Sequence, residues 1–217
     1  MQAEAVIDDG TTWRAQYRPV TIRVATIADV EAMNALIERS ARDLNQGHYT
    51  PEELAAAIDH VFGVDTRLVD DGSYYVAERD GALAGCGGWS GRRTLFGGDR
   101  FAGREDMRLD PATDAARIRA FFVAPDHARA GVATALLAAS VAAAHAAGFR
   151  TLELMATLPG VAFYQAAGFV AGEPILYRAG GVDVPFLPMT RKLSDPTGTI
   201  RRPASPQADQ RFGGAMS

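Results

Sequence analysis

The segment from Phe121 to Leu137 has the residue types and the order of an anion-binding turn. An apolar run, 121–123, is followed by a bend at Pro125, a tight turn with Gly131, and an Ala/Leu-rich helix start. The first backbone N–H groups of a helix have no partner within it, and the peptide dipoles favour negative charge at that end. These features predict an anion site at the helix start, and they leave the nature of the anion open.

Spacing alone allows three interpretations of this turn. A Walker-type phosphate loop needs a lysine and then Ser or Thr after its glycine, and no lysine follows Gly131 here. A dinucleotide fingerprint needs three spaced glycines and an acidic residue about 20 positions later, whereas this turn has one glycine. The third interpretation is a plain strand-to-helix connection in which the glycine only provides tight geometry.

Periodicity and turn residues predict the elements that must position this segment. Helices are expected at 27–42, 51–62, 131–147 and 161–167, and strands at 21–25, 73–78, 82–89, 116–123, 151–156, 169–177 and 184–193. Residues 91–114 show no pattern of regular structure. This order mixes hairpins with crossover helices, so we expect an α/β or α+β domain in which helices cover a mixed sheet.

Two local patterns sharpen this prediction. Thr50, Pro51 and Glu53 have the spacing of a capping box with proline at the first helical position, which marks a helix start. Gly85, Gly87 and Gly88 interrupt one predicted strand, so a bulge or a close backbone approach is expected there.

Length and composition favour one globular domain. With 217 residues, 47% of them hydrophobic, the chain is long enough for a substantial core, which we expect over residues 20–193. Residues 1–19 are predicted to be a flexible arm. The Pro-, Gly-, Ser-, Gln- and Arg-rich residues 194–217 are predicted to be a disordered tail.

Several function classes find no support in the composition. A net charge of −4 gives no reason to expect nucleic acid, and no apolar run approaches the ~18 residues of a membrane span. The lone Cys86 excludes an intramolecular disulfide framework, and the four scattered histidines do not suggest a metal site. The first twenty residues carry acidic side chains rather than a secretory signal, so a cytoplasmic protein is expected.

Two sequence blocks resemble signatures of the GCN5-related N-acetyltransferase (GNAT) superfamily. The first is Val123-x-Pro125-x5-Gly131-x-Ala133-x2-Leu136-Leu137, and the second, 162–169, is a short helical stretch that ends in Gly-Phe. The likeness covers roughly residues 21–193. It implies a twisted, mostly antiparallel sheet of about seven strands flanked by about four helices. In this fold the two central parallel strands, ending at Val123 and beginning at Thr151, splay apart.

The resemblance also implies that the co-substrate is acetyl-CoA, with no metal. Its pantetheine arm would pair with the strand ending at Val123, and its pyrophosphate would be the anion of the turn. The implied cofactor-binding residues are Phe121, Phe122, Val123, Ala128, Arg129, Ala130, Gly131, Val132, Ala133 and Thr134. The family pattern begins with Arg or Gln where this chain has Ala128. Backbone amides do not depend on that side chain, and Arg129 could supply the charge or could be a solvated surface residue.

Tyr164 occupies the place where the family commonly has its general acid. A phenol with a pKa near ~10 is protonated at neutral pH and can donate to a thiolate whose thiol has a pKa near ~8.5. Backbone N–H groups near Val123 could polarise the thioester carbonyl. The strand 118–123 contains no acidic residue. Glu153 on the following strand is the nearest candidate base, but a solvated or structurally paired carboxylate is the alternative, so no base is assigned.

The acceptor side carries no readable pattern. Residues that could line it are Gly87, Gly88, Trp89, His48 and Tyr49. Arg92 and Arg93 could meet an acidic acceptor or the 3′-phosphate of the coenzyme, or could simply be solvated. The expected activity is transfer of an acetyl group to an amine of a small molecule or a protein, with no nucleic-acid or membrane partner and a homodimer as the family's common state. A non-catalytic acyl-CoA-binding module is the alternative. An RNA-directed transferase would need a basic surface, which the composition does not indicate.

Overall fold

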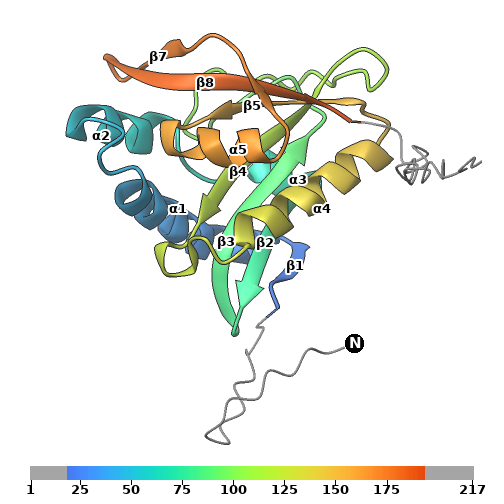
Figure 1. Cartoon of the computed structure of the whole chain (residues 1–217), viewed down its shortest axis with the longest axis horizontal. Coiled ribbons are helices and arrows are strands. Elements are labelled where there is room, and N and C mark those ends of the chain that lie inside the picture. The colour runs from blue at the N-terminus through green and yellow to red at the C-terminus, as the bar shows by residue number, and fades with distance from the viewer. Residues whose placement is uncertain (1–18, 194–217) are drawn as a thin grey trace, which may run out of the picture.

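A computed structural model describes residues 19–193 of the chain (Figure 1). The predicted tail, 194–217, lies outside these residues, and so does the predicted arm, 1–19, except for its last residue. Both therefore stay predictions, together with the domain bounds 20 and 193.

The described residues form one mixed sheet of eight strands in the order β1-β2-β3-β4-β5-β8-β6, with β7 paired to β8. Every strand pair is antiparallel except β4–β5. The strands are β1 Thr21–Val24, β2 Tyr74–Arg79, β3 Ala82–Ser90, β4 Ala116–Val123, β5 Thr151–Ala156, β6 Val170–Ala171, β7 Ile175–Ala179 and β8 Val182–Lys192. The predicted fold class is confirmed.

Five α-helices accompany the sheet within the same residues. They are α1 Val30–Leu44, α2 Pro51–His60, α3 Thr66–Asp70, α4 Val132–Ala146 and α5 Val161–Ala166. The capping box predicted for α2 is confirmed. The Glu53 N–H donates to Thr50 Oγ1 over 3.2 Å, and the Thr50 N–H donates to Glu53 Oε2 over 2.7 Å. Gly148, at φ +99°, ends α4 in the left-handed conformation that glycine adopts most easily.

Two details differ from the predicted elements. The single strand expected at 169–177 is wrong, because Gly172 and Pro174 separate β6 from β7. Pro174 has no N–H for a strand ladder, and the Gly172 N–H donates to the Pro188 carbonyl over 2.8 Å. The short helix α3 was not expected. Asp65 caps its first turn by accepting from the Arg67 N–H over 3.2 Å.

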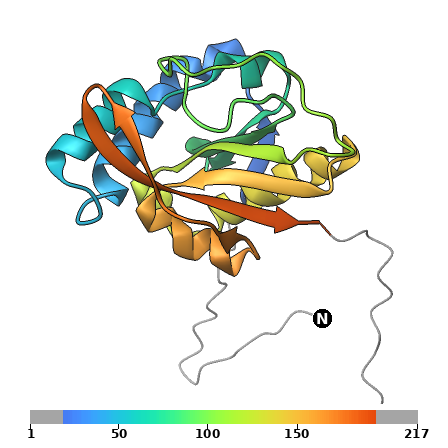
Figure 2. The ribbon, with the colours of Figure 1, turned by 90° about the horizontal axis from the view of Figure 1, so that it is seen from above.

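The two parallel strands stay together for only two residue pairs, Ala116 with Leu152 and Arg117 with Glu153. In Figure 1, β4 then runs toward the lower left while β5 stays near the top, and α5 appears between them. β5 is instead paired along its whole length with β8, which lies beside it in Figure 2. Within residues 19–193, the β4 edge from residue 118 to 123 therefore has no strand partner on the β5 side.

A bulge in β4 contributes to this divergence. Between the pairs Cys86–Phe122 and Gly88–Arg119, β3 advances by two residues and β4 by three. The extra residue is Ala120, at φ +54°, and such a bulge bends the strand that carries it. A Cβ at Gly87 would lie 2.7 Å from the Phe121 ring, so this position needs glycine. Both alternatives expected at the β3 glycines occur: β3 has an extra residue, Ala84, between the pairs Ala77–Gly85 and Glu78–Leu83, and a Cβ at Gly88 would lie 2.3 Å from the Ser73 carbonyl oxygen.

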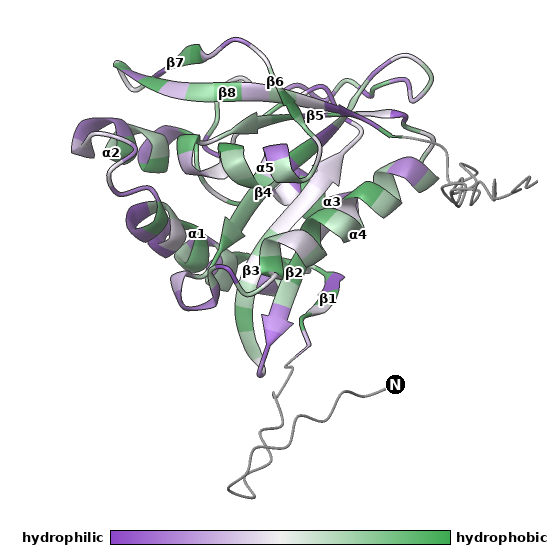
Figure 3. Cartoon of the chain, in the orientation of Figure 1, coloured by the Kyte–Doolittle hydropathy of each residue, from purple (hydrophilic) through white to green (hydrophobic). Residues whose placement is uncertain are grey.

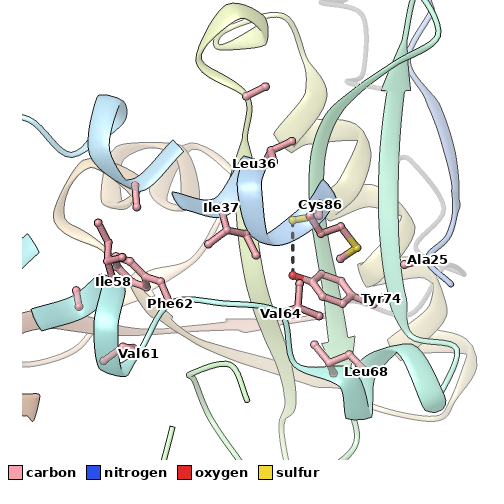
Figure 4. Close-up of a cluster of buried hydrophobic side chains, with 14 of the residues drawn as sticks. Ala25, Leu36, Ile37, Ile58, Val61, Phe62, Val64, Leu68, Tyr74 and Cys86 are labelled. Carbon is pink, nitrogen blue, oxygen red and sulfur yellow. Dashed lines mark hydrogen bonds between the residues drawn. The ribbon is translucent and has the colours of Figure 1, made fainter. Parts of the chain in front are cut away.

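Buried side chains cover both faces of the sheet. One cluster joins α1, α2 and α3 to the sheet, and two others join α4 and α5 to it. The diverging ends of β4 and β5 are hydrophobic (Figure 3). In the first cluster the Tyr74 hydroxyl donates to Cys86 Sγ over 3.6 Å (Figure 4), and burial raises the pKa of that thiol to about 12. Cys86 is thus a buried, unreactive side chain.

A buried ion network fixes the segment 91–114 against β4. The Arg119 guanidinium, 1% exposed, donates to Asp65 Oδ2 and to the Thr94 carbonyl, each over 2.8 Å. The other carboxylate oxygen, Asp65 Oδ1, accepts from Arg104 over 2.8 Å. The segment has no named helix or strand, yet it is anchored from within the core.

This network predicts a large stability loss for Asp65→Asn. Removing one partner of a buried ion pair leaves the other charge uncompensated, so we expect the free energy of unfolding to fall by about 3–5 kcal/mol in urea titration. The matched control is Asp183→Asn, because the Arg178–Asp183 pair is largely exposed, and it should cost less than about 1 kcal/mol. Equal losses in the two variants would contradict a central role for the network.

Candidate active site

A cavity of about 780 Å³ lies at the diverging ends of β4 and β5. Its walls come from β4, the turn before α4, the first turn of α4, the end of β5, and α5. The walls also include the end of α1, residues 61–63 after α2, residues 96–98 of the 91–114 segment, and β8. The predicted site residues that line it are Phe121, Phe122, Val123, Ala128, Arg129, Gly131, Val132, Ala133, Thr134 and Tyr164. Ala130 is in the same turn but does not line the cavity.

The turn before α4 presents backbone donors to this cavity. Arg129 at φ +62° and Gly131 at φ +83° both have left-handed backbone, and no atom lies within 4 Å of a Cβ placed at Gly131. Within residues 19–193, the N–H groups of Val132, Ala133 and Thr134 have no hydrogen-bond partner. An anion is the ligand that such a cluster of free donors favours.

The free edge of β4 borders the same cavity. Residues 118 and 120–123 line it, and beyond Arg117 their β5-facing edge has no strand pairing in the described part of the chain. Unpaired strand edges away from water are costly unless another group satisfies their backbone N–H and C=O groups. The edge is therefore suited to an extended ligand that carries amide groups.

Tyr164 faces the cavity from α5. It is 9% exposed, and its ring packs edge-on against Phe121, Phe163 and Phe169 with centroids 5.0–6.4 Å apart. Its hydroxyl has no hydrogen-bond partner among the described residues, and burial raises its pKa. A phenol in this environment keeps its proton and has a free donor.

The structure gives no carboxylate base in the cavity. Glu153 forms an ion pair with Arg117 at the closed end of the parallel pair and is not a lining residue. In the described walls, the ionisable side chains are those of His127, Arg129 and Tyr164. No group of His, Cys, Asp and Glu side chains suited to a metal ion occurs in residues 19–193.

The side chains expected at the acceptor site lie elsewhere. The positions Gly87, Gly88, Trp89, His48 and Tyr49 are all outside the cavity lining. Trp89 packs edge-on against Phe149, with centroids 5.9 Å apart, so it belongs to the core. Arg92 pairs with Asp71 over 2.7 Å, and Arg93 lies 3.7 Å from Glu105.

The cavity contains residues that sequence reasoning missed. They are Asn45 at the end of α1, Phe62 after α2, Phe96 in the 91–114 segment, Met155 in β5 and Phe186 in β8. These residues are far apart in sequence and share no spacing pattern. Met155 and Phe186 are apolar residues within their strands, and Asn45, Phe62 and Phe96 lie outside the helices and strands, so nothing in the sequence separates these five from ordinary core or loop residues.

Tyr49 holds the segment that closes this end of the fold. Residues 45–50, which we call the strap, connect α1 to α2. The Tyr49 hydroxyl donates to the Pro185 carbonyl and accepts from the Leu158 N–H, each over 3.0 Å. Burial raises the pKa of this phenol to about 12. The strap is thereby tied both to β8 and to the segment leading into α5.

The model of the acetyltransferase (GNAT) family matches residues 33–169, more than half of the chain. The chain therefore belongs to this family. No curated protein is similar enough in sequence to give a significant match.

Solved structures show the same fold at low sequence identity. A GCN5-related N-acetyltransferase from Rhodopseudomonas palustris is 21% identical, with a TM-score of 0.59 over 80% of this chain and 95% of that one. The PaiA N-acetyltransferase of Thermoplasma acidophilum, solved with coenzyme A, is 16% identical, with a TM-score of 0.52 over 80% and 99%. An N-acetyltransferase from Staphylococcus aureus Mu50 is 16% identical, with a TM-score of 0.54 over 81% and 99%.

The strap predicts a structural role for the Tyr49 hydroxyl. Tyr49→Phe leaves the Leu158 N–H and the Pro185 carbonyl without this partner, so we expect the free energy of unfolding to fall by about 1–3 kcal/mol in urea titration. Tyr177→Phe is the matched control, because the Tyr177 hydroxyl has no hydrogen-bond partner within residues 19–193, and it should change stability little. A Tyr49→Phe variant as stable as the control would show that the strap is not held this way.

Proposed function

We propose that this protein is an acetyl-CoA-dependent N-acetyltransferase acting on a primary amine of a small molecule or a protein. One observation carries the proposal: free donors at the α4 N-terminus, the open β4 edge and the Tyr164 hydroxyl border a single cavity. Membership of the acetyltransferase family supports it.

The cavity walls fit the two polar parts of acetyl-CoA. The pyrophosphate suits the N–H groups of the turn and of the first turn of α4. The space beside Gly131 is open, so a larger side chain there would occupy the position of the pyrophosphate. The amide groups of the pantetheine arm suit the unpaired β4 edge at residues 121–123. We assign coenzyme binding to these residues and to 128–134, with Arg129 as the basic side chain.

The reaction needs one proton donor and one polarising group from the protein. Acetyl-CoA supplies an acyl group activated as a thioester. The amine nitrogen forms a bond to the carbonyl carbon, and the carbon–sulfur bond breaks. Tyr164 gives its proton to the departing sulfur, and the proton lost by the nitrogen restores the phenol through water. A backbone N–H of β4 near Val123 stabilises the developing oxyanion.

The absence of a carboxylate in the described walls is compatible with this chemistry. Burial disfavours the charged form of an amine, so an apolar cavity lowers the pKa of a bound ammonium group and favours the neutral nucleophile. A water molecule can then accept the remaining proton. We assign no side chain as the base.

Other parts of the proposal rest on the sequence and the family. A cytoplasmic location and a homodimer remain predictions, as does the absence of nucleic-acid and membrane partners. Within residues 19–193, no helix is long and apolar enough to cross a membrane.

Gly131→Glu should abolish acetyl-CoA binding in calorimetric titration, because it adds bulk and a negative charge beside the free donors. Gly181→Glu is the matched control. Gly181 also has a positive φ, +95°, and open space at its Cβ position, but it lies outside the cavity lining. The control should bind as the wild type does. Micromolar affinity retained in Gly131→Glu would refute this placement of the coenzyme.

Tyr164→Phe should lower kcat by about 10²- to 10⁴-fold while the Kd of acetyl-CoA stays unchanged, because only the proton donor is removed. Since the pKa of Tyr164 is raised above the ordinary ~10, the wild-type rate should show no alkaline loss from this group below pH ~10. Tyr75→Phe, outside the cavity, is the control.

Unchanged turnover in Tyr164→Phe would remove the tyrosine from the mechanism. Acetyl-CoA binding by the wild type without acetylation of any amine in a broad panel would instead favour a non-catalytic acyl-CoA-binding module.

A further inference from the structure

Four phenylalanine rings that line the cavity lie beside one another. Phe62 packs edge-on against Phe122 and Phe186, with ring centroids 5.4 and 6.3 Å apart, and Phe96 lies 5.7 Å from Phe186. Met155 lines the same cavity from β5. Figure 4 shows Phe62 beside Ile58 in a cluster of buried hydrophobic side chains. We call the five residues Phe62, Phe96, Phe122, Met155 and Phe186 the aromatic wall.

Within residues 19–193, charged side chains are absent from this part of the cavity. The two basic lining residues, His127 and Arg129, belong to the turn before α4. No Asp or Glu side chain lines any part of the cavity within residues 19–193. The aromatic wall therefore offers no counter-ion for a second ammonium group and none for a carboxylate.

We infer that the acceptor is a primary amine with an aromatic or similarly bulky apolar group, of the arylalkylamine type. This inference rests on the proposed function and names the substrate class of the same site. The apolar group packs against the aromatic wall. Amine attack and proton transfer then follow the scheme above, with no additional reactant.

The same walls discriminate against other amines. A polyamine or an aminosugar would bury extra ammonium or hydroxyl groups without partners, which costs more than the loss of apolar contact. An amino acid would place its carboxylate against phenylalanine rings. Burial of a phenyl group, by contrast, favours binding in proportion to the apolar area removed from water.

Matched acceptors test this inference with the full-length protein. Release of free CoA from acetyl-CoA is measured with 2-phenylethylamine, phenylalanine, butylamine and 1,4-diaminobutane. We expect kcat/KM to be about 10- to 100-fold higher for 2-phenylethylamine than for butylamine, because the ring is buried. For phenylalanine, which adds a carboxylate, kcat/KM should be at least about tenfold lower than for 2-phenylethylamine. For 1,4-diaminobutane, which adds a second ammonium group, it should be at least about tenfold lower than for butylamine.

Met155→Glu tests the missing counter-ion directly. A carboxylate in the wall should raise kcat/KM for 1,4-diaminobutane relative to 2-phenylethylamine by at least about tenfold over the wild-type ratio. Met107→Glu adds the same charge at a residue that is 61% exposed and outside the cavity, and it should leave the ratio unchanged. If Met155→Glu fails to fold, the wild-type acceptor series still decides the question.

Failure of this inference differs from failure of the proposed function. If acetyl-CoA binds and 1,4-diaminobutane or phenylalanine is preferred to 2-phenylethylamine, the acceptor class is wrong while the transferase stands. If acetyl-CoA binds and no amine in a broad panel is acetylated, the transferase itself fails and the non-catalytic acyl-CoA-binding module is favoured. If acetyl-CoA does not bind in calorimetry, the proposed function itself fails.

Discussion

The separation of β4 from β5 is the constraint on which the rest of this structure depends. Two register pairs join the strands, and then β5 continues beside β8 while the Ala120 bulge bends β4 away. A parallel pair that opens in mid-sheet leaves backbone groups of β4 without partners, an arrangement that costs free energy in isolation. The same opening creates the cavity and brings α5 and the α4 turn to its borders.

Contacts made by segments outside the β4–β5 pair stabilise the opening between the two strands. The buried Arg119–Asp65 pair anchors the 91–114 segment to β4, and Phe96 of that segment reaches the cavity. On the other side, the Tyr49 hydroxyl ties the strap to β8 and to the start of the α5 segment. Both are polar contacts in a mostly apolar setting, where a missing partner is expensive. Such contacts favour one arrangement of the walls over its alternatives.

The cavity divides into a polar end and an apolar end, and the division is consistent with transfer between unlike molecules. Free N–H groups and a basic turn suit the proposed anionic, amide-rich coenzyme, whereas phenylalanine rings suit the proposed apolar amine. Tyr164 also borders the cavity, and its pKa is raised by burial. The low polarity that keeps this phenol protonated also favours a neutral amine, so in the proposed reaction one property of the cavity would serve both proton requirements.

The sequence by itself determined the fold class, the capping box of α2, the ends of β4 and β5, and the residues of the α4 turn. These features arise from local patterns: hydrophobic periodicity, turn residues and two motif blocks. Tertiary structure decided the acceptor side, where Asn45, Phe62, Phe96, Met155 and Phe186 arrive from five separate segments. It also decided that the Tyr49 hydroxyl links the strap to β8 and that Trp89 is a core residue. Long-range packing brings such residues together, and each has the local pattern of an ordinary core or loop residue, so no spacing in the chain could reveal their meeting.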